Sequence, residues 1–286
     1  MKLDREGAPG VEATPRARPR GGLLARPSSM LLALLTFSML LGTCEGGVRI
    51  LRPPPWLFPA PSEIAVALYR GFAVDPASSG GYYVHVLTTL EEALAGWVIG
   101  SVLGILLGVL LSQVRFLERL FLPYVNATQT IPKIAIAPIF LIWFGLGIES
   151  KIALVITSAF FPNFLNTLVG VKSVEQDLID MMRSLGATKS EIARRILLPN
   201  SLPMIFASLE LALLHSFLAA VAGEFVGARQ GIGVLLLERS HNLDMAGMFA
   251  LLVILAVLGW TLDSLLLFVR QRALFWSPVV RGQSGS

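Results

Sequence analysis

A small set of polar side chains interrupts the apolar stretches of this sequence, and these are the best placed to do chemistry. They are Thr130, Lys133, Asn163, Asn166, Glu210 and Asp263. Ionisable groups are costly to keep in apolar surroundings, so a functional role is the default interpretation. Lys133 could attract an anion, or it could neutralise Glu210 or Asp263. The sequence leaves both alternatives open.

The signatures of an enzyme are missing. The sequence contains neither H-E-x-x-H nor G-x-S-x-G, and His85, His215 and His241 are scattered. His215 lies five residues after Glu210 on a different helical face, so we expect a packed or hydrogen-bonded histidine. The single cysteine, Cys44, can form no internal disulfide, and no Cys/His cluster has metal-ligand spacing. No catalytic residue and no metal or cofactor site is therefore expected.

The sequence also lacks the phosphate-binding loop G-x-x-x-x-G-K-[ST], and it contains no GK dipeptide at all. We therefore expect that the chain does not hydrolyse ATP itself.

The composition indicates an integral membrane protein. Of the 286 residues, 54% are hydrophobic and only 15% are charged. The mean hydropathy is +0.70. Soluble domains carry about 25% charged residues.

The apolar runs predict an all-α membrane protein with about six transmembrane helices, since one span needs about 20 apolar residues. Five good spans lie at 93–114, 120–148, 152–171, 201–223 and 246–269. A shorter run predicts a first helix at 30–44, which is either retained or cleaved as a signal peptide. In both cases the chain emerges outside from residue 45 onward.

The positive charges predict the orientation. With both termini inside, the inner segments 1–29, 114–119, 172–200 and 270–286 hold 16 of the 23 Lys and Arg residues. The outer segments 45–85, 145–151 and 227–245 hold 6. This bias follows the positive-inside rule and predicts six helices with both termini in the cytoplasm.

The chain divides into five parts. We expect a disordered basic N-terminus at 1–29, the first helix at 30–44, an external segment at 45–85 and a flexible tail at 277–286. The external segment holds PPPWLFPAP at 53–61, ahead of an interfacial helix at 62–72. Residues 86–276 form one membrane domain that includes a cytoplasmic loop at 174–200.

Four glycines share one face of the second span. Gly96, Gly100, Gly104 and Gly108 are spaced by four residues, which lets another helix approach closely. Packing within the bundle is favoured over a dimer contact.

The third span contains Pro123, Pro132 and Pro138, each of which removes a backbone donor. Such breaks are tolerated where the backbone faces protein or a wet cavity. We therefore expect a kinked helix that lines a path, the alternative being a purely structural kink. Near its outer end, Phe140, Trp143 and Phe144 could form a gate or an interface belt.

The outer end of the fifth span offers a second gate. Glu224 ends that span ahead of the glycine-rich turn GARQGIG. A re-entrant loop here would be an external gate that contacts a binding protein.

The stretch SLGATKSEIARRILLP at 184–199 is basic and structured, although it lies between apolar spans. Gly186 falls where a helix C-cap favours a left-handed residue, and Thr188 to Glu191 form a capping box. Pro199 is expected to end the second, short helix. Because membrane spans tether the unit on both sides, we expect a rigid knob for a partner protein rather than a nucleic-acid reader. The alternative is a solvated basic loop.

DMMRSLGATKSEIARRILLP resembles the EAA loop of permease subunits of bacterial ABC importers. Gly186, Ile196, Leu198 and Pro199 fall at matching positions, while Asp180, Met181 and Met182 replace the E-A-A start. TTLEEALAGWVIGSVLGILLG, TIPKIAIAPIFLIWFGLG, FFPNFLNTLVGV and GEFVGARQGIG extend the resemblance over about residues 63–276. They resemble the type I, binding-protein-dependent branch that imports nitrate, sulfonates, taurine and vitamin or pyrimidine-type precursors.

The resemblance implies partners. Two permease copies, a homodimer by resemblance, would form the path, an external solute-binding protein would deliver the solute, and two ABC ATPase subunits would hold ATP and Mg. The coupling helix would contact the ATPase. The residues that the resemblance and the pattern assign to this contact are Asp180, Leu185, Gly186, Ala187, Thr188, Ile192, Ile196 and Pro199. Those assigned to the translocation path or gate are Thr130, Pro132, Lys133, Phe140, Trp143, Asn163 and Glu224.

Two other classes of protein compete with this interpretation. A stand-alone secondary transporter would show an inverted repeat with paired broken helices, but clear proline breaks occur only in the third span. An intramembrane enzyme would need a nucleophile and base, or metal ligands, on facing helices.

Overall fold

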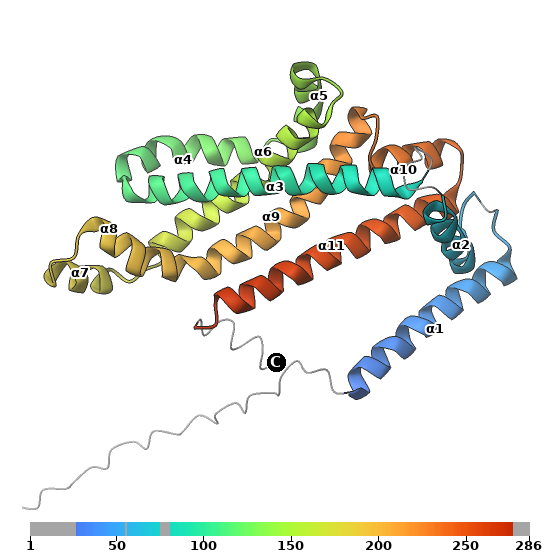
Figure 1. Cartoon of the computed structure of the whole chain (residues 1–286), viewed down its shortest axis with the longest axis horizontal. Helices are drawn as coiled ribbons and strands as arrows, with labels where there is room; N and C mark the ends of the chain where they lie inside the picture. The colour runs from blue at the N-terminus through green and yellow to red at the C-terminus, as the bar shows by residue number, and fades with distance from the viewer. Residues whose placement is uncertain (1–26, 55, 75–80, 277–286) are drawn as a thin grey trace, which may run out of the picture.

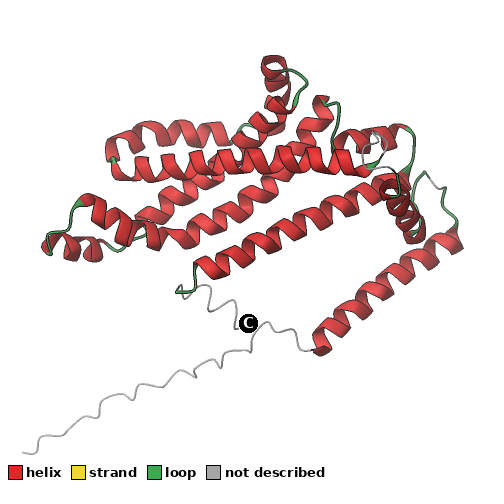
Figure 2. Ribbon diagram, in the orientation of Figure 1, coloured by secondary structure: helices red, strands yellow, loops and turns green. Residues whose placement is uncertain are grey.

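The computed structural model describes residues 27–54, 56–74 and 81–276. Every regular element in this part of the chain is a helix (Figures 1 and 2). Among the described residues five helices are long and apolar enough to cross a membrane, and the number is six if a bent pair of helices is counted as one span. The all-α prediction with about six spans is therefore confirmed. Of the predicted terminal segments at 1–29 and 277–286, residues 1–26 and 277–286 lie outside the described residues.

The N-terminal helix is longer than predicted. Helix α1 covers Pro27–Leu51 rather than 30–44, so it is long enough to span a bilayer. Thr43 lies inside it and bonds its hydroxyl to the Met39 and Leu40 carbonyls of the preceding turn. Helix α2 (Pro61–Phe72) follows close to the predicted interfacial position and packs against α1, α3 and α11.

The core is a stack of three long helices, α3 (Tyr82–Gln113), α6 (Ile148–Lys172) and α9 (Leu198–Gly227). Helix α6 lies between the other two and has the most extensive contacts with both. Helix α3 begins at Tyr82, four residues before the predicted membrane domain.

The glycine face of α3 packs against α6, which confirms close packing within the bundle. A Cβ atom added at Gly100 would lie 2.6 Å from the Ile156 carbonyl oxygen, and one at Gly104 would lie 2.6 Å from that of Phe160. Real Cβ atoms do not approach backbone this closely, so only glycine permits this spacing of the two helices.

The third span is broken rather than kinked. Helices α4 (Arg115–Gln129) and α5 (Lys133–Phe144) meet at an angle of 95°. The break falls at Pro132, which lacks an N–H group and forces Ile131 toward an extended conformation. Pro123 and Pro138 lie inside their helices without ending them. Figure 1 shows α4 returning along α3 and α5 turning away from it.

The two ends of the bundle differ. One end carries α7 (Gln176–Ser184) and the short α8 (Lys189–Ile192), which leads into α9 (Figure 1). The other end carries α2 and α10 (Ile232–His241), and α11 (Met245–Ala273) runs back from there.

Because the α3–α6 contact is made through backbone, Gly100→Ala should lower stability despite the better helix propensity of alanine. We expect a loss of about 1–3 kcal/mol, the usual range for overpacking. Gly259→Ala is the matched control, since a Cβ there meets nothing within 4 Å. Thermal unfolding of the detergent-solubilised protein measures both. Equal midpoints for the two variants would contradict glycine-dependent packing.

Candidate functional site

The knob formed by α7, its glycine turn and α8 has the local geometry that its sequence predicts. Gly186 has a φ of +80°, a left-handed conformation that side chains disfavour. Its N–H donates to the Arg183 carbonyl at 2.9 Å, which closes the end of α7. Thr188 N–H donates to the Glu191 carboxylate at 2.9 Å, and Glu191 N–H donates to the Thr188 hydroxyl at 3.3 Å. The C-cap and the capping box are both confirmed.

The residues predicted for the coupling contact fall into two groups. Leu185 is 76% exposed at the tip, and Asp180 and Thr188 are also exposed, while Ala187 is half-buried. Ile192 is only 5% exposed, and Ile196 is buried as well. The two isoleucines therefore anchor the knob within the chain, and the predicted direct contact through Ile192 does not fit this arrangement.

Pro199 does not end the second helix, contrary to the sequence interpretation. Residues Ala193–Leu197 form a π-helical turn, and the chain then continues as α9 through Pro199. The Leu198 N–H donates to the Ala193 carbonyl, a bond one residue longer than in an α-helix. This wider turn places Pro199 in the first turn of α9, where a missing N–H is tolerated.

The break between α4 and α5 borders a cavity of about 350 Å³. Its lining includes Gln129, Lys133, Ser158, Phe161 and His215. The Lys133 ammonium donates to the Gln129 carbonyl at 2.8 Å and lies 5.3 Å from the centre of the Phe161 ring. Among the described residues Lys133 makes this one hydrogen bond, which uses a single N–H of an ammonium that can donate three.

The structure bears on two of the sequence expectations at this cavity. Among the described residues Lys133 forms no ion pair with Glu210 or Asp263, and Glu210 instead accepts from Arg270 at 3.0 and 3.1 Å. His215 is exposed on α9 and lines the cavity, so the expectation of a packed histidine is wrong.

The other predicted path residues have different surroundings. Thr130 and Pro132 are exposed at the break. Phe140 packs 6.1 Å from the ring of Trp143, which is exposed. Asn163 is buried and joins three helices, because it donates to the Ser101 hydroxyl at 2.9 Å and accepts from Ser208 at 2.8 Å. Its surroundings indicate a structural link rather than a path position.

Glu224 holds the loop between α9 and α10. Its side chain is 1% exposed and accepts from the Thr89 hydroxyl at 2.6 Å and from the Gly233 N–H at 2.5 Å. Thr89 also accepts from the Ile232 N–H at 2.9 Å, and the His85 ring bonds the Gly231 backbone at 3.0 Å. We call this set the outer latch. Because Glu224 is buried, it acts on the loop and not by touching an external protein.

A buried acid and a buried base that the sequence did not reveal lie beside the latch. Glu92 and Lys151 are each 2% exposed, and they line a second cavity of about 350 Å³ with Arg229. Lys151 donates to the Leu146 and Gly147 carbonyls at 2.9 and 3.1 Å. The sequence did contain a sign that Lys151 is buried. Lys151 lies at helical spacing from Leu154, Val155 and Ser158, which form the buried face of α6.

Residues 100–274 match the family described as the binding-protein-dependent transport system inner membrane component, and the chain belongs to this family. The riboflavin transport system permease protein RibX of Chloroflexus aurantiacus is 35% identical, over 86% of this chain and 91% of its own. The formylaminopyrimidine transport permease protein ThiX of Halalkalibacterium halodurans is 34% identical, over 82% of this chain and 92% of its own.

A solved structure of an ABC transporter also matches this chain. A chain of the MetNI methionine ABC transporter in an inward-facing conformation matches with a TM-score of 0.58 and 25% identity. The match covers 70% of this chain and 94% of that one. The chain is therefore the permease component of a type I ABC importer, a multi-pass inner-membrane protein that works with an ATPase and a binding protein. This finding excludes a stand-alone secondary transporter as the interpretation.

Removing the Glu224 carboxylate should release the outer loop. Hydrogen bonds to a buried charged group contribute about 1.5–3 kcal/mol each. We therefore expect Glu224→Ala to speed tryptic cleavage after the exposed Arg229 by at least about tenfold. Glu238→Ala, an exposed acid on α10, is the control. Unchanged cleavage in Glu224→Ala would show that the latch does not hold the loop.

Proposed function

We propose that this chain is one of two identical permease subunits, and that its knob is the docking site of the ATPase. The observation that carries this proposal is a large apolar side chain, Leu185, presented to solvent on a rigid, doubly capped turn. An exposed leucine at the tip of an ordered protrusion supports insertion into an apolar groove of a partner. The backbone bonds around Gly186 support transmission of force rather than flexible tethering.

The charges around the knob support the same role. Arg194 and Arg195 are exposed on the π-helical turn next to α8. They are positioned to pair with acidic side chains on the ATPase, which would hold ATP and Mg. In this proposal ATP hydrolysis belongs entirely to that separate subunit.

We place the knob in the cytoplasm and the outer latch outside. The excess of Lys and Arg on the knob side supports this orientation. Helix α1 begins, and α11 ends, on the side of the bundle away from α2 and α10 (Figure 1). Both termini would then be cytoplasmic, and the external binding protein would approach the latched loop.

A second copy of this chain would complete the path. Ile131 and Pro132 are exposed at the break between α4 and α5. Irregular backbone at membrane depth is tolerated where protein or a wet cavity covers it, but not against lipid. In a homodimer that encloses this break, the irregular backbone would be covered by the second protein copy and by the wet cavity between the copies.

The cavity at the break is the proposed solute path. Its volume of about 350 Å³ suits a small molecule. The relatives named above are called transport proteins for riboflavin and formylaminopyrimidine, and a sulfonate permease of Escherichia coli is 30% identical. We propose a solute of this size, with an oxyanion or other electron-rich group attracted to Lys133. The aromatic set of Phe140, Trp143 and Phe144 would border the outer part of the path.

Co-purification tests the docking site. Leu185→Asp should abolish recovery of the ATPase from native membranes, because a charge would have to enter an apolar groove. Gly186→Asp should do the same by straining the turn. Leu57→Asp, which changes an exposed leucine of the external segment, is the control. Recovery of equal ATPase with all three variants would contradict docking at the knob.

A charge-selective labelling experiment tests the path without knowledge of the solute. His215→Cys in a Cys44→Ser background places one thiol at the cavity. We compare its reaction rates with an anionic sulfonatoethyl and a cationic trimethylammonioethyl methanethiosulfonate. Lys133→Gln should lower the anionic-to-cationic rate ratio about tenfold, since the local positive potential is lost.

Lys172→Gln is the control for this ratio, because Lys172 pairs with Glu118 at the knob end of the bundle. An unchanged ratio in Lys133→Gln would remove Lys133 from the path. A thiol that reacts with neither reagent would contradict an accessible cavity.

A further inference from the structure

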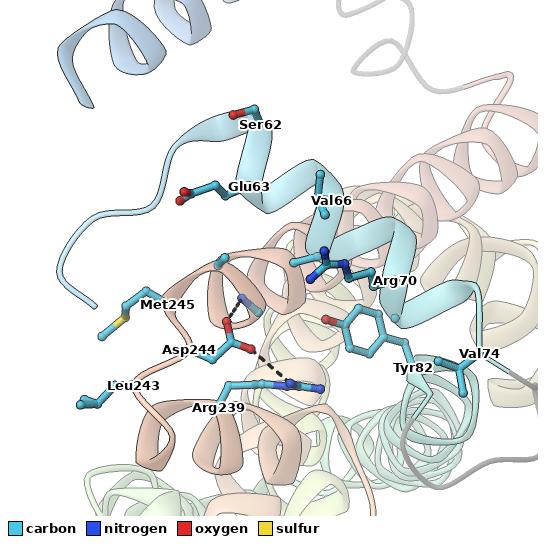
Figure 3. A pocket seen from close by; sticks show the side chains of 14 residues that line it. Ser62, Glu63, Val66, Arg70, Val74, Tyr82, Arg239, Leu243, Asp244 and Met245 are labelled. Atoms are coloured by element: carbon cyan, nitrogen blue, oxygen red, sulfur yellow. Dashed lines mark hydrogen bonds and ion pairs between the residues drawn. The ribbon is translucent and has the colours of Figure 1, made fainter. Parts of the chain in front are cut away.

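A third cavity, of about 650 Å³, lies apart from the knob, the path and the latch. It opens between α2, the start of α3 and the turn from α10 into α11 (Figure 3). Its charged and polar lining includes Glu63, Arg70, Tyr82, Arg239 and Asp244. No role assigned above uses this cavity.

Tyr82 directs an unpartnered hydroxyl into this space. The side chain is 2% exposed, and its ring packs edge-on against Phe72 with centroids 5.6 Å apart. Among the described residues its hydroxyl has no hydrogen-bond partner. Figure 3 shows the hydroxyl pointing into the cavity, toward the side chains of α2 and α10. The hydroxyl is therefore free to donate a hydrogen bond to a ligand oxygen that enters the cavity.

Two guanidinium groups add further donors. Arg70 reaches into the cavity from α2 and makes no ion pair or hydrogen bond with a described residue. Arg239 uses one nitrogen to pair with Asp244 at 3.1 Å, while its Nε is buried and unpartnered. Both groups are forks of N–H donors that match the oxygens of a phosphate.

The two acids at the cavity, Glu63 and Asp244, leave most of the N–H donors of Arg70 and Arg239 without a partner. Glu63 accepts from the Ala60 N–H at 3.0 Å, which caps α2. Asp244 accepts from the Gly247 N–H at 2.9 Å in addition to Arg239. The two acids and the two arginines balance in charge, but N–H groups of Arg70 and Arg239 remain without partners, so the ligand must supply acceptor oxygens.

The surroundings place the cavity at the level of lipid headgroups. Trp56 and Tyr69 on the segment around α2, and Tyr83 at the start of α3, are exposed. Exposed Trp and Tyr side chains are typical of the membrane–water interface. Farther along the chain, α1 and α11 expose apolar side chains such as Leu40 and Val257, which suit acyl chains. A soluble anion would gain nothing from these surfaces.

We propose that this cavity binds the phosphodiester of a phospholipid headgroup, with Arg70, Tyr82 and the exposed part of the Arg239 guanidinium as donors. The bound lipid would join α2 to the turn between α10 and α11. It would therefore fix the interfacial helix against the end of the bundle that also carries the outer latch.

Native mass spectrometry of the purified full chain with its bound partners tests this site. The probe is dioleoylphosphatidylglycerol, compared with dioleoylglycerol, which lacks the phosphate, and with inorganic phosphate as a competitor. The test variant is Arg70→Gln with Tyr82→Phe, which keeps the aromatic ring. Arg52→Gln is the matched control, because Arg52 is an exposed external arginine that does not line the cavity.

We expect one phosphatidylglycerol to bind at least tenfold more weakly to the double variant, with the control unchanged, since each lost bond to charge weakens binding about tenfold. Equal binding by the double variant, or equal retention of dioleoylglycerol, would overturn the proposal. Displacement of the lipid by millimolar inorganic phosphate would assign the site to a soluble anion instead and would equally overturn it. Because the readout is lipid mass, recovery of the ATPase separately reports whether the proposed docking function holds.

Discussion

The close approach of α3 to α6 is the constraint on which the rest of the structure depends. Lipid chains are as apolar as the helices, so burial of apolar surface does not drive helices together in a membrane. Gly100 and Gly104 instead bring the α3 backbone into contact with the α6 carbonyls. Four glycines at spacing of four extend this contact over about 18 Å of helix. A methyl group at any of them would separate the two backbones.

The polar bonds between helices depend on that spacing. Asn163 on α6 reaches Ser101 on α3 and Ser208 on α9 with short side chains, which is possible only where the backbones are near. Trp97 of α3 donates its indole N–H to the Leu209 carbonyl of α9 at 3.1 Å. At the latch, Thr89 and Glu224 join the same pair of helices. Each bond lies in apolar surroundings, where an unmade bond is expensive, so together they specify one register of three helices.

Local features could be predicted from the sequence, and long-range ones could not. The Gly186 turn and the Thr188 capping box are determined by residues within a few positions, and both are confirmed. The glycine face of α3 is equally local. By contrast, each of the three prolines in the third span predicts a break in the helix equally well. Only the packing of the folded chain determines that the helix breaks at Pro132.

The prediction that Pro199 ends the helix was wrong because a π-helical turn precedes this proline and lets the helix continue through it. No residue type predicts such a turn. Burial at the site is also a long-range property. Ile192 was assigned to the contact with the ATPase, but its side chain is buried within the chain. His85 bonds Gly231 across 146 positions of sequence, and only the folded bundle brings them together.

Helix α9 links the two functional ends of the molecule. The helical unit from Lys189 to Gly227 has 39 residues, or about 58 Å of nearly continuous helix. Its first turns carry the knob, and its last turns carry Glu224 and thus the outer loop.

In the proposed function, a displacement of the knob by the ATPase would act on one end of this unit. Packing against α6 keeps the unit from bending freely, so the displacement would reach the latch as a shift of Glu224 against Thr89. The π-helical turn at Ala193–Leu197 departs from the regular α-helical hydrogen-bond pattern close to the knob. It would therefore decide how much of the displacement is passed on and how much is absorbed.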